Sequence, residues 1–241
     1  VTGAYGEWKD YNAYSDFISS EGVPVFYARV DHVSVPLAKE GTGQVVVDFT
    51  PEPLTQDVSF VFHIEKTADV VVDSLTAEIS GIPSTMELTT GLILAQKTYK
   101  LLFRPTYAAL PSAADSASAE ALRCEASVNI PGIVRSHTED MVTGPGILQI
   151  AIYTHYDYEE EGTQRKAAKV FHAGINLYHT LKERKSLQWD EEENGYRQAS
   201  RSITVEIGSP LNIDKDGILN GGSTSTGLDQ WIPGETFEIE V

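Results

Sequence analysis

Hydrophobic and polar residues alternate along most of this chain. In the segment DVSFVFHIEK, Val58, Phe60, Phe62 and Ile64 occupy every second position. Successive side chains of a strand point to opposite faces, so this period of two predicts strands with one buried face. Eight further segments follow the same pattern, with Phe49 and Phe237 among their core positions: QVVVDF (44–49), LTAEIS (75–80), TYKLLF (98–103), CEASVNI (124–130), ILQIAIY (147–153), KVFHAGINLY (169–178), SITVEI (202–207) and FEIEV (237–241).

Turn-forming residues separate these segments. Many short strands joined by turns are typical of an all-β sandwich or barrel. Helix candidates are limited to residues 7–18 and the Ala/Ser-rich residues 113–123, and the second fits a loop equally well. Residues 111–121 and the charge-dense residues 182–201 are predicted as an exposed loop and a long solvated hairpin connection, and either could carry recognition. The predicted turns are Gly81–Ser84, Pro131–Gly132, Gly144–Gly146, Asp216–Gly217 and Gly221–Gly222.

The net charge of the chain excludes some classes of binding partner. It has 241 residues, with 18 Lys and Arg against 35 Asp and Glu, for a net charge of −17. A field of that sign repels phosphate backbones and anionic membranes, so nucleic acid is not expected as a partner. Cys124 is the only cysteine, so no intrachain disulfide forms, and its place in an alternating strand predicts that it is buried.

Candidate catalytic and metal-binding motifs are weak. The segment from Asn212 to Asn220, with Asp214, Asp216 and Gly217, matches part of an EF-hand calcium loop. The twelfth position is Ser223 instead of a bidentate Glu, which favours an Asp-Gly turn without calcium. No nucleophile elbow, HExxH motif, phosphate-binding loop or dinucleotide fingerprint occurs. We therefore expect no cofactor and no enzymatic activity. A hydrolase with two convergent carboxylates is kept as the third hypothesis, after the two binding hypotheses given below.

Aromatic residues are the candidate contact residues. Tyr153, Tyr156 and Tyr158 follow each other at a strand end, and Trp189 and Trp231 lie in loop-like sequence. Such rings stack on sugars or anchor protein partners. The competing interpretation is that they pack at a sandwich edge. Tyr153, Tyr156, Tyr158 and Trp231 are the residues expected to contact a partner or a glycan.

Two long segments carry a resemblance to a known family. Gln44–Gly91 contains a strand of VxFxP type and the run LTAEISGIPST, and Gly227–Val241 contains Asp-x-Trp followed by a strand. Together they resemble the fimbrillin-associated lipoproteins of Bacteroidales, which anchor pili or serve as minor pilus subunits. The resemblance implies a transthyretin-like β-sandwich over residues 44–241, preceded by residues 1–43 as the remnant of an N-terminal β module or a linker.

The same resemblance implies a place and a role. It implies export to the outer membrane surface or the fimbrium, with contact to the membrane only through an N-terminal lipid anchor that this chain lacks. The expected partners are other pilus subunits or surface proteins. Our leading hypothesis is a non-enzymatic structural or adhesive protein that binds its neighbours by addition of β-strands. The alternative is a surface glycan-binding module.

Overall fold

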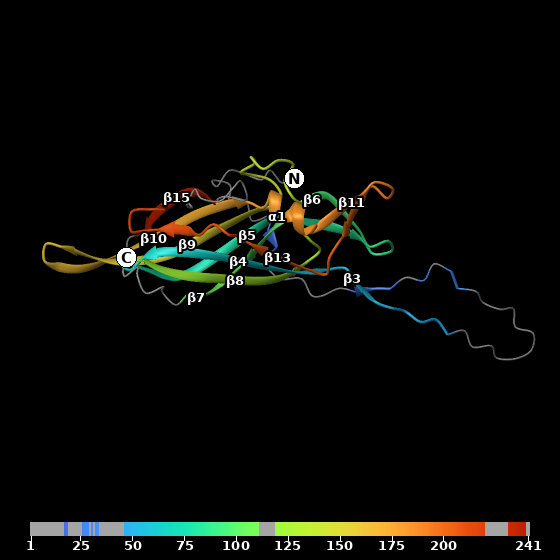
Figure 1. Ribbon diagram of the computed structural model, residues 1–241, viewed down its shortest axis with the longest axis horizontal. Helices are drawn as coiled ribbons and strands as arrows, with labels where there is room; N and C mark the ends of the chain where they lie inside the picture. Colours follow the sequence, from blue (N-terminus) through green and yellow to red (C-terminus); the bar gives the residue numbers. More distant parts are fainter. Residues whose placement is uncertain are drawn as a thin grey trace, which may run out of the picture.

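The computed structural model describes residues 17–18, 26–28, 30, 32–33, 46–110, 119–219 and 231–239. Strands make up most of this part of the chain, and they form two main sheets with a common hydrophobic core (Figure 1). The all-β prediction is therefore confirmed. One short helix, α1 (Tyr178–Arg184), follows β10. No helix in the described residues is long and apolar enough to cross a membrane.

The larger sheet contains eight strands. Seven of them form a continuous antiparallel path, and β1 (Phe17–Ile18) pairs parallel to β6 beside it. Along the path the strands are β11 (Leu187–Asp190), β12 (Gly195–Gln198), β6 (Leu92–Phe103), β5 (Val70–Glu87), β9 (Ile147–Glu160), β10 (Thr163–Asn176) and β15 (Trp231–Ile239).

The smaller sheet has β4 near its centre. β4 pairs antiparallel with β8 and parallel with β13 and β14, which lie far away in the sequence. The strands are β13 (Ser202–Glu206), β4 (Gln56–Thr67), β8 (Ala119–Ile130) and β7 (Thr106–Ala109), with β14 (Leu211–Ile213) beside β4. A separate two-stranded pair joins β2 (Phe26–Tyr27) to β3 (Glu52–Pro53).

Alternating side chains of both sheets build the core. On β4, Val58, Phe60, Phe62 and Ile64 are all fully buried, as the period of two predicts. The ring of Phe60 stacks on Phe103 of the opposite sheet with 5.1 Å between centroids. Leu148, Ile150 and Ile152 of β9, Ile203 and Val205 of β13, and Phe171, Ala173 and Ile175 of β10 belong to the same core.

Two predicted core positions are exposed. Residues 46–50 form no strand, and the side chain of Phe49 is 59% exposed. Alternation alone cannot bury a strand face, because a strand also needs a neighbour with which to pair, and no described residue pairs with this segment. Phe237 on β15 is 50% exposed, and its ring contacts His172 on the neighbouring strand instead of the core. The predictions for Phe49 and Phe237 are therefore wrong.

The predicted turn at Gly81–Ser84 is a bulge inside a long strand. β5 runs through these residues, and its register against β6 shifts between Ser80 and Ile82. Gly81 has a φ of +92°, which L side chains rarely adopt, and a Cβ there would lie 2.5 Å from the carbonyl oxygen of Val134. A glycine in a strand marks this kind of close backbone approach. The bend lets the 133–146 segment pack against β5.

Three further sequence predictions, one connection and two helix candidates, differ from the structure. The 182–201 segment is not one solvated connection, because α1 ends within it and β11 and β12 form a hairpin of the larger sheet. Ala119 begins β8, so the part of the 113–123 helix candidate that the structure describes is a strand. Of the 7–18 helix candidate, only Phe17–Ile18 is described, and it forms β1. Residues 111–118 and 220–230 lie outside the described residues.

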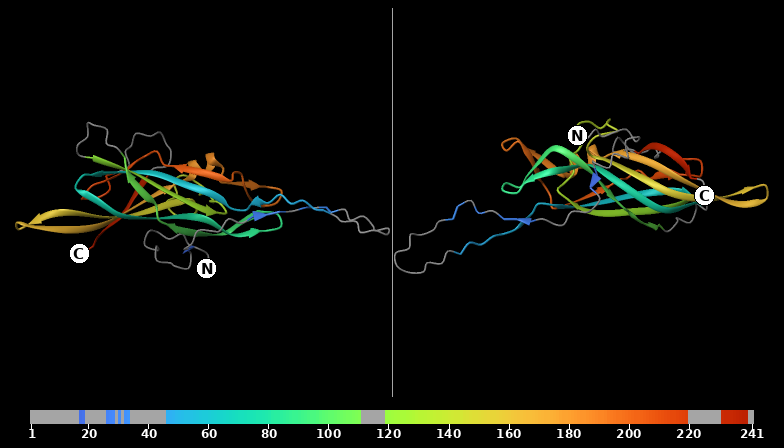
Figure 2. Two further views of the ribbon diagram at one scale, coloured as in Figure 1. Left: turned by 90° about the horizontal axis from the view of Figure 1, so that it is seen from below. Right: turned by 180° about the vertical axis from the view of Figure 1, so that it is seen from behind.

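The ends of the molecule carry two projecting ribbons. The β9–β10 hairpin turns at Glu161 and Gly162, both with positive φ, as a two-residue type I′ turn requires. Residues 157–166 of this hairpin are exposed on both strands. The β2–β3 pair projects from the opposite end (Figure 2).

Cys124 lies in the core, as expected, and its burial has a testable consequence. Burial raises the pKa of the Cys124 thiol from 9.0 to about 12. Because the thiolate is the reactive form, we expect no labelling of the native protein by a disulfide reagent at pH 8, and labelling of one thiol in denaturant. The unfolded thiol ionises at lower pH than the folded one, so this group makes the free energy of unfolding fall between pH 9.0 and about 12. Cys124→Ala should lack that component; rapid native labelling would contradict the prediction.

Candidate functional site

The tyrosines of β9 do not form one surface. β9 pairs with β10 without a bulge, so strand alternation places Tyr153 on the face opposite to Tyr156 and Tyr158. The rings of Tyr156 and Tyr158 lie 6.3 Å apart, and the ammonium of Lys169 lies 5.4 Å from the Tyr156 ring centroid. On β9, the candidate glycan-contact residues are therefore Tyr156 and Tyr158 only. Glycan binding by these two residues stays a prediction.

Trp231 is a core residue and not a surface contact. Its side chain is 5% exposed, and its ring meets Phe62 edge to face at 5.8 Å. The indole Nε1–H donates to the carbonyl oxygen of Ser209 at 2.9 Å. The ring contributes its area to the core while its only polar atom is satisfied by the backbone. We therefore remove Trp231 from the candidate contact residues.

A cleft opens where α1 meets the β11–β12 hairpin and the segment 133–135. We call it the α1 cleft; its volume is about 320 Å³. Clefts of this size hold small ligands in proteins. Its apolar side is formed by Ile133, Leu181 and Leu187, of which the first two are buried. The β11–β12 hairpin adds aromatic side chains to the cleft, and α1 and segment 133–135 add cationic ones.

The hairpin supplies an aromatic wall. Trp189 on β11 is directly opposite Tyr196 on β12, and their rings pack edge to face at 4.9 Å. The Trp189 side chain is 46% exposed. The hairpin is held by an ion pair between Arg197 and Asp190 at 2.8 Å, and this arginine lowers the pKa of the Asp190 carboxyl. An exposed indole on a short, pinned hairpin is a rigid contact surface.

Three cationic residues, Arg135, Lys182 and Lys185, also line the cleft. Arg135 and Lys182 both lie over the ring of Tyr178, at 5.6 and 5.7 Å from its centroid. Lys185 follows α1 in the left-handed conformation, with a φ of 51°, and also lines the cleft. Among the described residues that line the cleft there is no Asp or Glu. The cleft is thus locally cationic on a chain with a net charge of −17.

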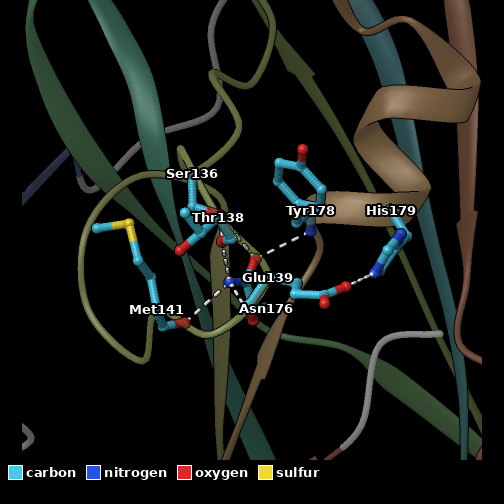
Figure 3. Close-up of polar contacts among 7 residues, drawn as sticks. All are labelled: Ser136, Thr138, Glu139, Met141, Asn176, Tyr178 and His179. Atoms are coloured by element: carbon cyan, nitrogen blue, oxygen red, sulfur yellow. Dashed lines mark hydrogen bonds and ion pairs between the residues drawn. The ribbon is translucent and has the colours of Figure 1, made fainter. Parts of the chain in front are cut away.

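Asn176, at the end of β10, holds the loop of residues 136–141, which follows Arg135. Its buried side-chain amide donates to the carbonyl oxygens of Thr138, Glu139 and Met141 at 3.0, 3.0 and 2.9 Å. Its Oδ1 accepts from the backbone N–H of Tyr178 at 2.9 Å. Two N–H groups shared among three carbonyls satisfy a loop that makes no sheet ladder of its own (Figure 3).

Two side-chain contacts extend this arrangement. The hydroxyl of Ser136 also lies 2.9 Å from Asn176 Oδ1. The imidazole of His179 on α1 contacts the carboxylate of Glu139, which ties the loop to the helix (Figure 3). We call Asn176 with residues 136–141 and 178–179 the Asn176 clasp. It holds segment 133–141 against α1 and so sets the position of Arg135.

A second buried network fixes the other side of the cleft. Gln56 Nε2 donates to the carbonyl oxygens of Ser186 and Ser200 at 3.0 and 3.1 Å, and its Oε1 accepts from the Ser186 hydroxyl at 2.8 Å. The same hydroxyl accepts from the backbone N–H of Ile133 at 3.0 Å. Gln56 and Ser186 are fully buried. The start of β11 is therefore locked to β4 and to the 133–135 segment.

The calcium candidate forms a turn. Asp214 Oδ1 accepts from the backbone N–H groups of Asp216 and Gly217, both at 2.8 Å, so this carboxylate caps its own loop. Asn220 lies outside the described residues. Within the described part of the chain, no group of three or more His, Cys, Asp or Glu side chains is arranged to hold a metal ion.

Comparisons with known proteins give no assignment. No protein-family model, no curated protein and no solved structure matches this chain. Trp189 stands out in the sequence, but the cleft does not, because its lining comes from three segments whose register the residue pattern does not reveal.

Proposed function

We propose that this chain is a structural or adhesive protein of a cell surface, a pilus anchor or minor subunit, which binds neighbouring subunits by β-strand addition. The carrying observation is the side of β6 that faces away from β5, where residues 94–99 have no pairing partner among the described residues. On that side, among the described residues, β6 pairs only at Ile93 with β12 and at Lys100 and Leu101 with β1. Unpaired N–H and C=O groups along such an edge are a template for another strand.

A second feature supports binding by extended chain. We call residues 26–28, 30, 32–33 and 46–53, which include the β2–β3 pair, the arm. It runs out of the sandwich, and its two paired strands are two residues each (Figure 1). The arm exposes Phe26, Val46 and Phe49, with Val46 at 71%. A pair this short has little stability of its own, so apolar side chains here fit burial against a neighbour.

The family resemblance supports the same proposal in part. Trp231 and β15 suit the closing Asp-x-Trp-plus-strand segment, and LTAEISGIPST lies within β5. The expected opening strand at residues 44–49 has no counterpart in the described residues 46–50. As part of this proposal we place the sandwich in the transthyretin-like, fimbrillin type and the protein on the outer membrane surface or the fimbrium.

The test is complex formation with pilus subunits purified from the cell that makes this chain. We expect a stable complex by size exclusion at micromolar concentration, with slowed amide hydrogen exchange in residues 94–99 of β6. Phe49→Asp should weaken the complex at least about tenfold, because it places a charge in an apolar contact. Leu219→Asp, at an exposed position beside β14 of the smaller sheet, should not. Failure of every subunit to bind at about 100 μM, equivalent to less than about 6 kcal/mol, would remove the proposal.

A further inference from the structure

We propose that the α1 cleft binds a carboxylate-bearing sugar residue of an acidic glycan. This goes beyond the proposed function, because the cleft lies on α1 and the β11–β12 hairpin, not on the β6 edge or the arm. Three observations carry it: the sign of the charge in the cleft, the aromatic wall, and the fixed positions of the surrounding segments.

The charge of the cleft selects an anion. Arg135, Lys182 and Lys185 line it, and no carboxylate of the described part of the chain does, although the chain has nearly twice as many acidic as basic residues. None of the three makes an ion pair with another described residue; Arg135 and Lys182 instead flank the Tyr178 ring. A bound carboxylate would find cationic donors not already committed to a carboxylate.

The net charge limits how many negative charges that anion can carry. A field of −17 opposes the approach of polyanions such as nucleic acid, because every added charge is repelled by the whole surface. A sugar residue with one carboxylate needs only the local potential of three cations. Within this cleft, the balance of local attraction and overall repulsion therefore favours a ligand of low charge.

The aromatic wall selects a ring. Trp189 and Tyr196 present an indole and a phenol on one face of a hairpin, beside the apolar contacts of Leu181 and Leu187. The C–H face of a pyranose packs on such rings while its hydroxyl groups stay in water. The aromatic rings and the cations thus line one cavity of about 320 Å³.

The surrounding segments are already in place. The Asn176 clasp holds the loop behind Arg135, and the Gln56–Ser186 network holds Ile133 and the start of β11. Gly132 packs so tightly on Leu187 that a Cβ would come within 2.5 Å of it. Binding to a site fixed in this way loses little conformational entropy.

An acidic peptide is the competing ligand, and the shape of the site disfavours it. A peptide added to the edge strand β11 would find only four residues to pair with. Its side chains would extend along the strand, whereas the cations and the aromatic rings surround one concave space. We therefore assign the cleft to a saccharide and keep the peptide as an outcome of the test.

The test is a titration of the full chain with a trisaccharide that carries one galacturonic acid residue between two neutral sugars, followed by calorimetry and tryptophan fluorescence. The same trisaccharide with that residue methyl-esterified is the matched control, since it keeps the rings and removes the charge. We expect saturable binding of the acid and at least about tenfold weaker binding of the ester, as for loss of an ionic hot-spot contact. The fluorescence change should disappear in Trp189→Phe, because Trp189 is the exposed indole of the cleft.

Matched variants locate the site. Trp189→Ala and Lys182→Met should each weaken binding of the acid at least about tenfold. Lys166→Met, at an exposed lysine on the β9–β10 hairpin, and Tyr156→Ala, on β9, should leave it unchanged. Circular dichroism and the unfolding midpoint of each variant show whether it is folded, so a loss of binding can be assigned to the cleft.

Four results would overturn the proposal. The first is no binding of the acid up to about 10 mM, which means a binding free energy weaker than about 3 kcal/mol. The second is equal binding of the acid and the ester, and the third is retention of binding in both cleft variants with its loss in Tyr156→Ala. The fourth is binding of an Asp/Glu decapeptide that the trisaccharide does not displace. None of them bears on strand addition at β6, which is measured with pilus subunits.

Discussion

Replacing Phe60 by alanine should lower the free energy of unfolding by about 3–5 kcal/mol. Phe60 is fully buried on β4, and its ring stacks on Phe103 of the opposite sheet at 5.1 Å. The substitution removes the transfer free energy of the ring and leaves a cavity at the contact between the sheets, where two rigid layers cannot close over it. Urea denaturation monitored by circular dichroism measures the change.

Phe49→Ala is the matched control for this prediction. The same substitution at a side chain that is 59% exposed should change the free energy of unfolding by no more than about 0.5 kcal/mol, as at other surface positions. Equal effects at the two positions would contradict the core assignment of β4, and with it the assignment of residues 46–50 as an exposed segment outside the sheets.

Replacing Asn176 by alanine should cost about 3 kcal/mol or more, because it leaves several backbone groups without a partner at once. The carbonyl oxygens of Thr138, Glu139 and Met141 lose their donor, and the N–H of Tyr178 loses its acceptor. Each buried polar group left unsatisfied costs about 1–3 kcal/mol, and water entering the loop recovers part of that. We expect faster amide exchange in residues 136–141 together with the lower unfolding midpoint.

Asn176→Asp separates the two roles of this side chain. The carboxylate can still accept from Tyr178, but it cannot donate, and it places a negative charge against three carbonyl oxygens. At pH 7 it should be at least as destabilising as alanine, and part of the loss should be recovered as the pH falls and the carboxyl is protonated. Asn129→Ala, which removes one exposed hydrogen bond to Asp57, should cost under about 1 kcal/mol. Similar costs for Asn129→Ala and Asn176→Ala would show that the Asn176 clasp is not a structural support.

The strand pattern could be predicted from the sequence wherever a strand has one buried face. β4 is such a case, because every second residue is buried. This alternation can be recognised in the sequence of the segment alone. Residues 46–50 show the limit of this rule, because they carry a similar pattern but pair with no strand in the part of the chain that the structure describes. Periodicity reports which face could be buried, whereas burial itself depends on the rest of the fold.

The candidate site depends on contacts that local sequence does not encode. Trp231 follows Gly- and Ser-rich sequence and reads as a loop residue, yet Phe62 and Ser209, remote in the chain, enclose it. Trp189 was identified as a possible contact residue, but its cationic neighbours Arg135 and Lys182 come from two other segments. Only the pairing of strands brings these side chains to one cavity.

The position of β4 has a consequence for how the chain reaches its native state. One edge of β4 is completed by β13 and β14, which come from the last fifth of the sequence. During synthesis, Phe60 and Phe62 therefore stay uncovered on this side until Val205 and Leu211 have been made. Distant pairing of this kind slows folding and leaves an intermediate with exposed hydrophobic surface. The step that commits this protein to its fold comes late, when the last fifth of the sequence is available, and a chain cut before residue 202 should aggregate instead of forming a smaller sandwich.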